Sequence, residues 1–197
     1  IHENWGEGLI TYYRKGIIED NRFRNNWSVH LYVDYGYDLA IAQNVFLSDD
    51  PAFNWNEIYG PAVGIMLAQE GSRHDDAIEK IRIVNNLISG CGMGITTWVT
   101  YYRDIDIMHN VIYNPAQAAI GADALPGSLI PVTGVVVKNN IIYKPTVDKF
   151  GTGYLRVNQA QLPAWTFANN RWVDGMPTAG THAASTAALR AALDVTD

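Results

Sequence analysis

The stretch KNNIIY, residues 138–143, places two asparagines directly before two isoleucines and a tyrosine. Asparagine is depleted in β-strands, whereas Ile and Tyr favour them. An asparagine followed by apolar residues recurs along the chain, at Asn21, Asn44, Asn86, Asn110, Asn140 and Asn170. Successive members of this series lie 23, 42, 24, 30 and 30 residues apart, so the chain is a repeat of about 23 residues with insertions.

Each repeat is read as a coil of three short β-strands. Before each asparagine the apolar residues alternate, as in Ile81 and Ile83 or Ile105 and Ile107, which buries one face of a strand. An earlier strand in each coil carries GLITYY (8–13), VHLYVD (29–34), GIMLAQ (64–69), GITTWV (94–99) or AAIGAD (118–123). The period is too short for ankyrin or tetratricopeptide repeats, and the leucine spacing of leucine-rich repeats is absent. The sequence therefore predicts an all-β solenoid of about six coils.

We interpret the recurring asparagine as the site of a bend between the second and third strand of each coil. Asparagine tolerates left-handed backbone geometry, so we expect the bend at the asparagine itself. Stacked coils would bring successive asparagines to about 4.8 Å, the spacing of neighbouring strands. Their side-chain amides can then hydrogen-bond to one another along the stack, and we interpret the series as a structural ladder.

Composition narrows the class of protein. The chain has 197 residues, a net charge of −6 and one cysteine, Cys91, so we expect neither an intrachain disulfide nor a nucleic-acid partner. No apolar run reaches the ~18 residues of a membrane span, so no membrane partner is expected. The chain starts at Ile1 without a signal peptide, and we interpret it as a fragment or a processed form.

Two regions are predicted along the chain. Residues 1–173 form the solenoid, and residues 174–197 form a tail in which STAALRAAL, starting at the N-cap Ser185, reads as a short capping helix. The N-terminal end shows no comparable cap, which leaves a sheet edge open for self-association into a homo-oligomer.

Four segments resemble a known group of proteins: HENWGEGL (2–9), NNWSVHLYVD (25–34), GIMLAQE (64–70) and NNLISGCGMGITTW (85–98). They resemble right-handed parallel β-helix proteins of the pectate-lyase-like superfamily, and more narrowly an uncharacterised bacterial group that is often secreted. The resemblance implies a right-handed parallel β-helix and a secreted or cell-surface location. It implies no single activity, because this superfamily includes lyases, hydrolases and proteins without known chemistry.

Candidate site residues follow from the period-two rule in the first strand of each coil. With Leu31 facing inward, its neighbours in the second coil should face outward, and so should aromatic residues in nearby coils. The predicted catalytic residues are His30, Tyr32, Asp34 and, at the end of the next such strand, Glu70. The predicted substrate-binding residues are Tyr12 and Trp98 on these strands, Trp55 and Arg73 on the long loops inserted around the third coil, and Arg103.

Two mechanisms stay open for such a face. In a glycoside hydrolase, Asp34 and Glu70 would be the carboxylate pair. In a lyase, Tyr32 or His30 would be the base, and Arg14, Arg73 or Arg103 would neutralise a uronate carboxylate. No metal site and no resident cofactor are predicted, although Ca²⁺ is left open.

The predicted function is polysaccharide binding, with cleavage by a lyase or hydrolase mechanism left open. Aromatic faces stack on sugar rings, and six Trp and eleven Tyr residues supply them. The alternative is a non-catalytic β-helix for glycan binding or self-assembly, because no sharp catalytic signature is present.

Overall fold

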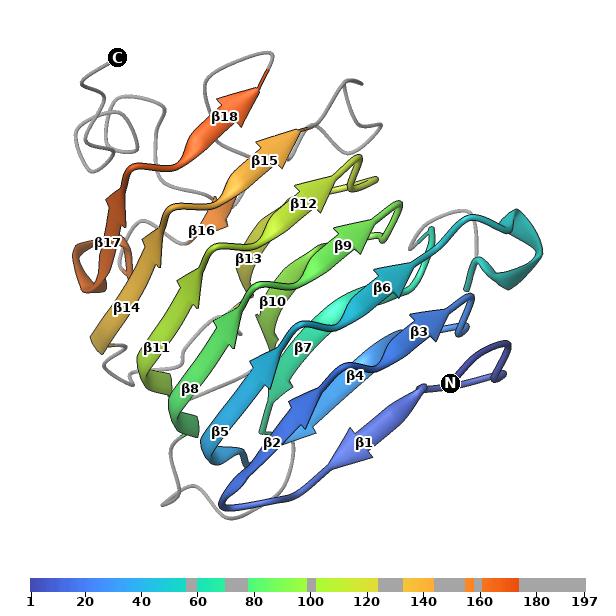
Figure 1. Ribbon diagram of the computed structural model, residues 1–197, viewed down its shortest axis with the longest axis horizontal. Helices are drawn as coiled ribbons and strands as arrows, with labels where there is room; N and C mark the ends of the chain where they lie inside the picture. Colours follow the sequence, from blue (N-terminus) through green and yellow to red (C-terminus); the bar gives the residue numbers. More distant parts are fainter. Residues whose placement is uncertain are drawn as a thin grey trace.

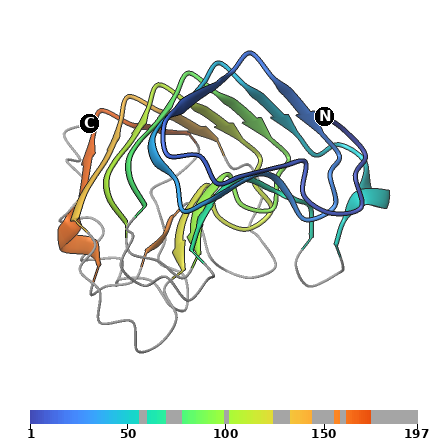
Figure 2. The same ribbon diagram turned by 90° about the horizontal axis from the view of Figure 1, so that it is seen from below.

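The computed structural model describes residues 1–55, 60–69, 78–98, 102–123, 133–143, 155–157 and 161–173. In these ranges the chain winds through three parallel sheets of six strands each (Figures 1 and 2). Two 3-10 turns, η1 (Pro51–Phe53) and η2 (Leu162–Ala164), interrupt the winding. The prediction of a right-handed parallel β-helix of about six coils is confirmed.

We number the sheets in the order in which each coil reaches them. Sheet 1 contains β1 (Leu9–Thr11), β4 (Val29–Asp34), β7 (Val63–Ala68), β10 (Ile95–Trp98), β13 (Ile120–Asp123) and β16 (Leu155–Val157). Sheet 2 contains β2 (Gly16–Glu19), β5 (Tyr37–Ala42), β8 (Ile78–Val84), β11 (Tyr102–Met108), β14 (Thr133–Lys138) and β17 (Trp165–Ala168). Sheet 3 contains β3 (Arg22–Arg24), β6 (Val45–Leu47), β9 (Leu87–Ser89), β12 (Val111–Tyr113), β15 (Ile141–Tyr143) and β18 (Arg171–Val173).

The interior is filled by matching side chains from successive coils. In sheet 2 the register aligns Ile41, Ile83, Ile107 and Val137, and all four are buried. In sheet 3, Phe23 and Phe46 stack with ring centroids 4.8 Å apart. Each fully buried aliphatic side chain stabilises the fold by about 1.5–3 kcal/mol, so the repeated apolar column is the main source of stability.

The asparagine ladder runs between sheets 2 and 3 as predicted. The side-chain amide of Asn86 donates to Asn110 Oδ1 at 3.0 Å, and Asn86 Oδ1 accepts the amide of Asn44 at 3.1 Å. The same Asn86 nitrogen also donates to the backbone carbonyls of Ile41 and Val84. Equivalent bonds link Asn21 to Asn44, Asn110 to Asn140 and Asn140 to Asn170.

The predicted position of the left-handed bend is wrong by one residue. Positive φ angles fall on the residue before each ladder asparagine: Asp20, Gln43, Asn85, His109, Asn139 and Asn169. These side chains lie at or near the surface, whereas the middle members of the ladder are buried. The preceding residue therefore makes the bend, and the ladder asparagine keeps an ordinary backbone while its amide satisfies interior carbonyls.

The tail at residues 174–197, with its predicted capping helix, lies outside the described residues. The part of the chain that the structure describes contains no helix of a length and apolarity that would cross a membrane.

Candidate functional site

His30 does not face outward, and this prediction is wrong. Its side chain is fully buried, and its ring lies 6.3 Å from that of the core residue Phe46. His30 and Leu31 are consecutive, yet both face the interior, because the strand begins at the corner between sheets 3 and 1. The positions that align with His30 in other coils are occupied by Gly8, Gly64, Gly94 and Ala119. A Cβ on Gly64 would lie 2.8 Å from Ile88 Cγ2, which confirms that this position points inward.

His30 belongs to a chain of hydrogen bonds that runs from the surface residue Asn4 into the interior. Asn4 Nδ2 donates to Asn26 Oδ1, which leaves Asn26 Nδ2 to donate to His30 Nδ1 at 2.9 Å. The imidazole proton then resides on Nε2, which lies 3.0 Å from Ser48 Oγ. Ser48 Oγ lies 3.8 Å from Cys91 Sγ, which donates to the carbonyl of Ser89.

Burial keeps both titratable groups of this chain neutral. Loss of solvent lowers the pKa of His30 from 6.5 to about 4. Burial also raises the pKa of the Cys91 thiol to about 12, and the hydrogen bonds with Ser48 and Ser89 oppose this only in part. The neutral imidazole therefore connects Asn26 to Ser48 inside the coil.

Tyr32 and Asp34 do lie on the outer face of sheet 1, but they are covered. Tyr32 is 9% exposed and packs with Val29, Val63, Met66 and Ala68. Asp34 is 7% exposed. The expectation that these side chains stand free on an open strand is therefore wrong, although their predicted chemical roles stay predictions.

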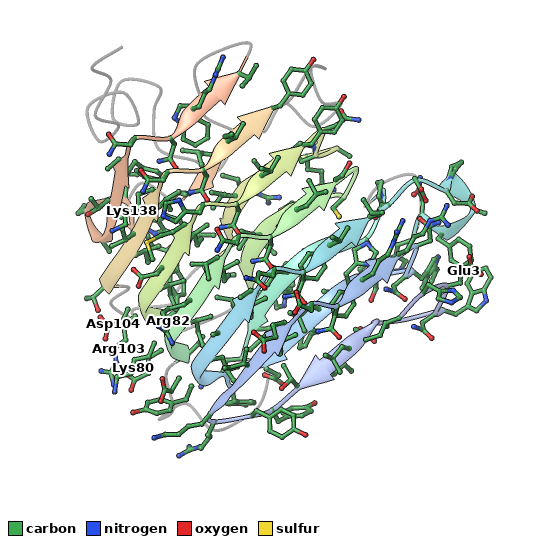
Figure 3. The ribbon with its side chains drawn as sticks, viewed as in Figure 1. Glu3, Lys80, Arg82, Arg103, Asp104 and Lys138 are labelled. Carbon is green, nitrogen blue, oxygen red and sulfur yellow. The ribbon has the colours of Figure 1, made fainter. Side chains whose placement is uncertain are left out.

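The other predicted site residues are scattered. Trp98 shares a register position with Asp34, two strands away in sheet 1, and is partly exposed. Tyr12 is exposed just after β1. Arg103 lies on sheet 2 beside Lys80 and Arg82, where it is paired with Glu79 (Figure 3). Arg103 therefore belongs to another face than Tyr32 and Asp34. Glu70 and Arg73 lie outside the described residues.

Trp55 belongs to a group of four aromatic side chains at the surface, which we call the Trp cluster: Trp5, Trp27, Phe53 and Trp55, of which Trp27 and Phe53 are half-buried. The ring centroids of Trp5 and Trp27 are 6.2 Å apart, those of Trp27 and Trp55 are 6.0 Å apart, and those of Trp5 and Phe53 are 5.6 Å apart. Trp5 is 74% exposed and Trp55 is 45% exposed. A contiguous exposed group of apolar side chains often marks an interaction site.

Three consecutive turns from sheet 3 to sheet 1 build the Trp cluster. The indole of Trp27 donates to the carbonyl of Asn54, and the backbone N–H of Trp27 donates to the carbonyl of Asn4. Each tryptophan follows an asparagine, in the pairs Asn4–Trp5, Asn26–Trp27 and Asn54–Trp55. This Asn-Trp repeat is the sequence signal for the cluster; the prediction from the inserted loop includes Trp55 and misses Trp5 and Trp27.

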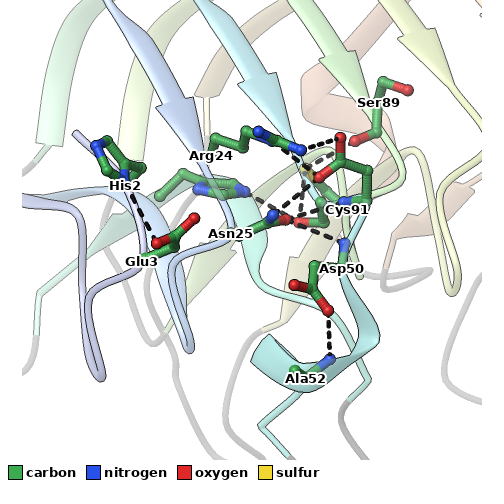
Figure 4. A network of polar contacts seen from close by, with 11 residues as sticks. His2, Glu3, Arg24, Asn25, Asp50, Ala52, Ser89 and Cys91 are labelled. Atoms are coloured by element: carbon green, nitrogen blue, oxygen red, sulfur yellow. Dashed lines mark hydrogen bonds and ion pairs between the residues drawn. The ribbon is translucent and has the colours of Figure 1, made fainter.

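A polar brace fixes the long turn that carries Phe53 and Trp55 (Figure 4). Arg24 binds Asp49 through two hydrogen bonds of 3.0 and 3.1 Å. Asn25 accepts the backbone N–H groups of Asp49 and Asp50 through Oδ1 and donates to Asp49 Oδ1. Asp50 then caps η1 by accepting the N–H of Ala52 at 2.9 Å. Hydrogen bonds from Arg24 and Asn25 lower the pKa of Asp49, so the brace is ionised at neutral pH.

The described residues do not fit a metal centre. No group of three or more His, Cys, Asp and Glu side chains that could hold an ion occurs in the described ranges. Ser48 Oγ contacts both His30 Nε2 and Cys91 Sγ, so these two potential ligand atoms lie on either side of one hydroxyl group. Burial, however, keeps the Cys91 thiol protonated. A metal needs the thiolate, so this buried pair is a poor ligand set.

Comparison with known proteins gives one match. The matching family is described as periplasmic copper-binding protein (NosD), a family of right-handed parallel β-helices, and the match covers residues 1–128. No curated protein and no solved structure matches the chain. Because the match covers well over half of the 197 residues, the chain belongs to the NosD family.

Proposed function

We propose that this protein is a non-catalytic, extracytoplasmic β-helix that binds glycans at the Trp cluster. The exposed rings of Trp5 and Trp55, packed against the half-buried rings of Trp27 and Phe53, carry this proposal. Aromatic faces bind the apolar faces of sugar rings, and packed indoles lose little conformational freedom when they do so. The description of the family as periplasmic supports a location outside the cytoplasm.

The absence of accessible proton-transfer groups at the predicted catalytic strand supports binding without cleavage. His30 is sealed in the core, and Tyr32 and Asp34 are covered. A general acid or base must reach the proton that it moves. Arg103 and its partner Glu79 both lie on sheet 2, whereas Tyr32 lies on sheet 1. Arg103 is therefore badly placed to neutralise a uronate near Tyr32.

Copper binding, which the family description names, finds no support in the described residues. They hold no suitable group of ligands, so we assign no step to a metal.

The proposal is tested by measuring affinity for a panel of soluble glycans by calorimetry, with wild type and four variants. We expect Trp5→Ala and Trp55→Ala to weaken binding about tenfold each, because each removes one stacking face. Trp98→Ala probes the predicted sheet 1 face, and Tyr113→Ala, an exposed aromatic on sheet 3, is the control. Both should bind as wild type does. Unchanged affinity in the Trp5 and Trp55 variants would overturn the assignment to the Trp cluster, and loss in Trp98→Ala alone would move the site to sheet 1.

Cleavage is tested separately on the same panel. Reducing ends and the ultraviolet absorbance of unsaturated uronates should both stay at the level of the blank, with or without Ca²⁺ and EDTA. New reducing ends that disappear in Asp34→Ala would overturn the non-catalytic assignment.

A further inference from the structure

The rings of the Trp cluster do not share a plane. The interplanar angle is 59° between Trp5 and Trp27, 52° between Trp27 and Trp55, and 36° between Trp5 and Phe53. A flat crystalline polysaccharide can stack only on rings that are nearly coplanar. Rings tilted by these angles form a curved surface, which several sugar units of one bent chain can follow together.

The charged side chains in the segments that carry the Trp cluster are all acidic. Its three supporting segments, residues 3–7, 25–28 and 49–55, contain four carboxylates and no Lys or Arg: Glu3, Glu7, Asp49 and Asp50. The nearby Arg24 is bound to Asp49 by two hydrogen bonds, so these two charges offset each other. Glu7 joins the first of these segments to the second, because it accepts a hydrogen bond from Ser28, the residue after Trp27.

Negative charge beside a binding surface repels anionic ligands. Polyuronates carry one carboxylate on every sugar and would approach Glu3, Glu7 and Asp50 without a free guanidinium in these three segments to receive them. A neutral sugar meets no such repulsion. Carboxylates are also good acceptors for sugar hydroxyl groups, which donate hydrogen bonds.

The surface is held in place before a ligand arrives. The brace of Arg24, Asn25 and Asp49 fixes the start of the turn, and the Trp27 indole is bound to the Asn54 carbonyl. A preorganised surface loses less entropy on binding. We infer that the Trp cluster is a selective site for a single, uncharged glycan chain in solution, and that polyuronates and crystalline polysaccharides are excluded. This inference rests on the proposed function.

The test uses pairs of soluble oligosaccharides with the same linkage and length that differ only in charge. The pairs are β-1,4-glucan with β-1,4-glucuronan, and β-1,4-mannan with β-1,4-mannuronan. In the pair that binds, we expect the neutral member to bind at least tenfold more tightly at low salt. The difference should shrink in 0.5 M NaCl, because salt screens repulsion between surface charges.

Glu7→Gln isolates the contribution of charge, because glutamine keeps an acceptor for Ser28. It should narrow the gap between the neutral and the anionic member about threefold. Glu19→Gln, an exposed carboxylate on β2 in sheet 2, is the matched control and should leave the gap unchanged. A pull-down with insoluble β-1,4-glucan should retain no more wild type than the Trp55→Ala variant.

The outcomes separate the two proposals. Binding of the uronate members at the Trp cluster with equal or higher affinity, or Trp-dependent retention on the insoluble glucan, overturns this inference and leaves the proposed function intact. Failure of every member of the panel to bind overturns both.

Discussion

At the scale of single residues, the corner position at the start of sheet 1 shows how a repeat accommodates one exception. Gly64 and Gly94 have no room for a side chain, whereas the same position in the second coil holds a complete imidazole. The imidazole fits because Asn26 and Ser48 offer a donor and an acceptor on opposite sides of the ring. The result is a neutral histidine with both nitrogens satisfied.

Stability should therefore fall in mild acid. Since the pKa of His30 is about 4 in the folded chain and 6.5 ordinarily, the unfolded chain takes up a proton first as the pH drops. The stabilisation is fully present above pH 6.5 and is lost as the pH falls towards 4, by on the order of 3 kcal/mol in total. Protonation would also turn Nδ1 into a donor facing the donor Asn26 Nδ2.

Urea denaturation at pH 7.0 and pH 4.5 measures this effect. His30→Gln should remove most of the difference between the two pH values, whereas His109→Asn, at an exposed histidine, should retain it. An equal pH dependence in the His30 variant and the wild type would show that other groups cause the loss.

Glycines at the same corner give a second prediction. A Cβ on Gly94 would lie 2.5 Å from the carbonyl oxygen of Ala119 and 2.8 Å from Ile112 Cγ2, so Gly94→Ala forces backbone to shift. We expect a loss of about 1–3 kcal/mol in the free energy of unfolding. Gly6→Ala meets nothing within 4 Å and should be within ~0.5 kcal/mol of wild type. Thermal melts of the two variants check this, and similar shifts would contradict it.

At the scale of elements, the asparagine ladder stabilises the turns between sheets 2 and 3. Asn86 has partners above, below and on the backbone, and it is 2% exposed. Replacing it leaves several interior groups without partners at once. Its cost should therefore exceed that of a single hydrogen bond.

Asn86→Ala is expected to lower the free energy of unfolding by about 3 kcal/mol or more. Asn21→Ala, at the first rung, should cost about 1 kcal/mol, because only Asn44 and the carbonyl of Glu19 lose a partner to it. Urea midpoints compare the two variants. Equal losses would mean that the rungs act independently of burial.

The fold was predictable at this scale because the period of the asparagines and the alternation of Ile81 and Ile83 both report local geometry. The candidate site was less predictable from the sequence than the fold. The period-two rule placed Tyr32 and Asp34 on the correct side of the strand, but it cannot report what covers that side. It also fails at His30, where the strand begins in a corner and two consecutive residues face inward. Predicting the Trp cluster requires knowledge of contacts between three coils, and the pattern of a single strand does not contain that information.

At the scale of the whole molecule, one thiol reports on the integrity of the interior. Cys91 is 1% exposed, and its pKa is raised to about 12. We expect no reaction with a thiol reagent at pH 8 in the folded protein and complete reaction in urea. The labelling midpoint in urea should match the midpoint seen by tryptophan fluorescence if the coils unfold together. Labelling well below that midpoint would show that the coils around Cys91 open first.

The asparagine ladder also gives the solenoid a dipole along its axis. Every amide donates towards the next coil, from Asn21 to Asn44 and onward to Asn170, so the side-chain dipoles point the same way along the axis. Aligned hydrogen bonds polarise one another, and their fields add in a poorly screened interior. The column therefore has a negative pole at Asn21 and a positive pole at Asn170, much as a helix has two unlike ends. A coil stacked before Asn21 must present a donor to it, which makes the order of coils along the axis irreversible.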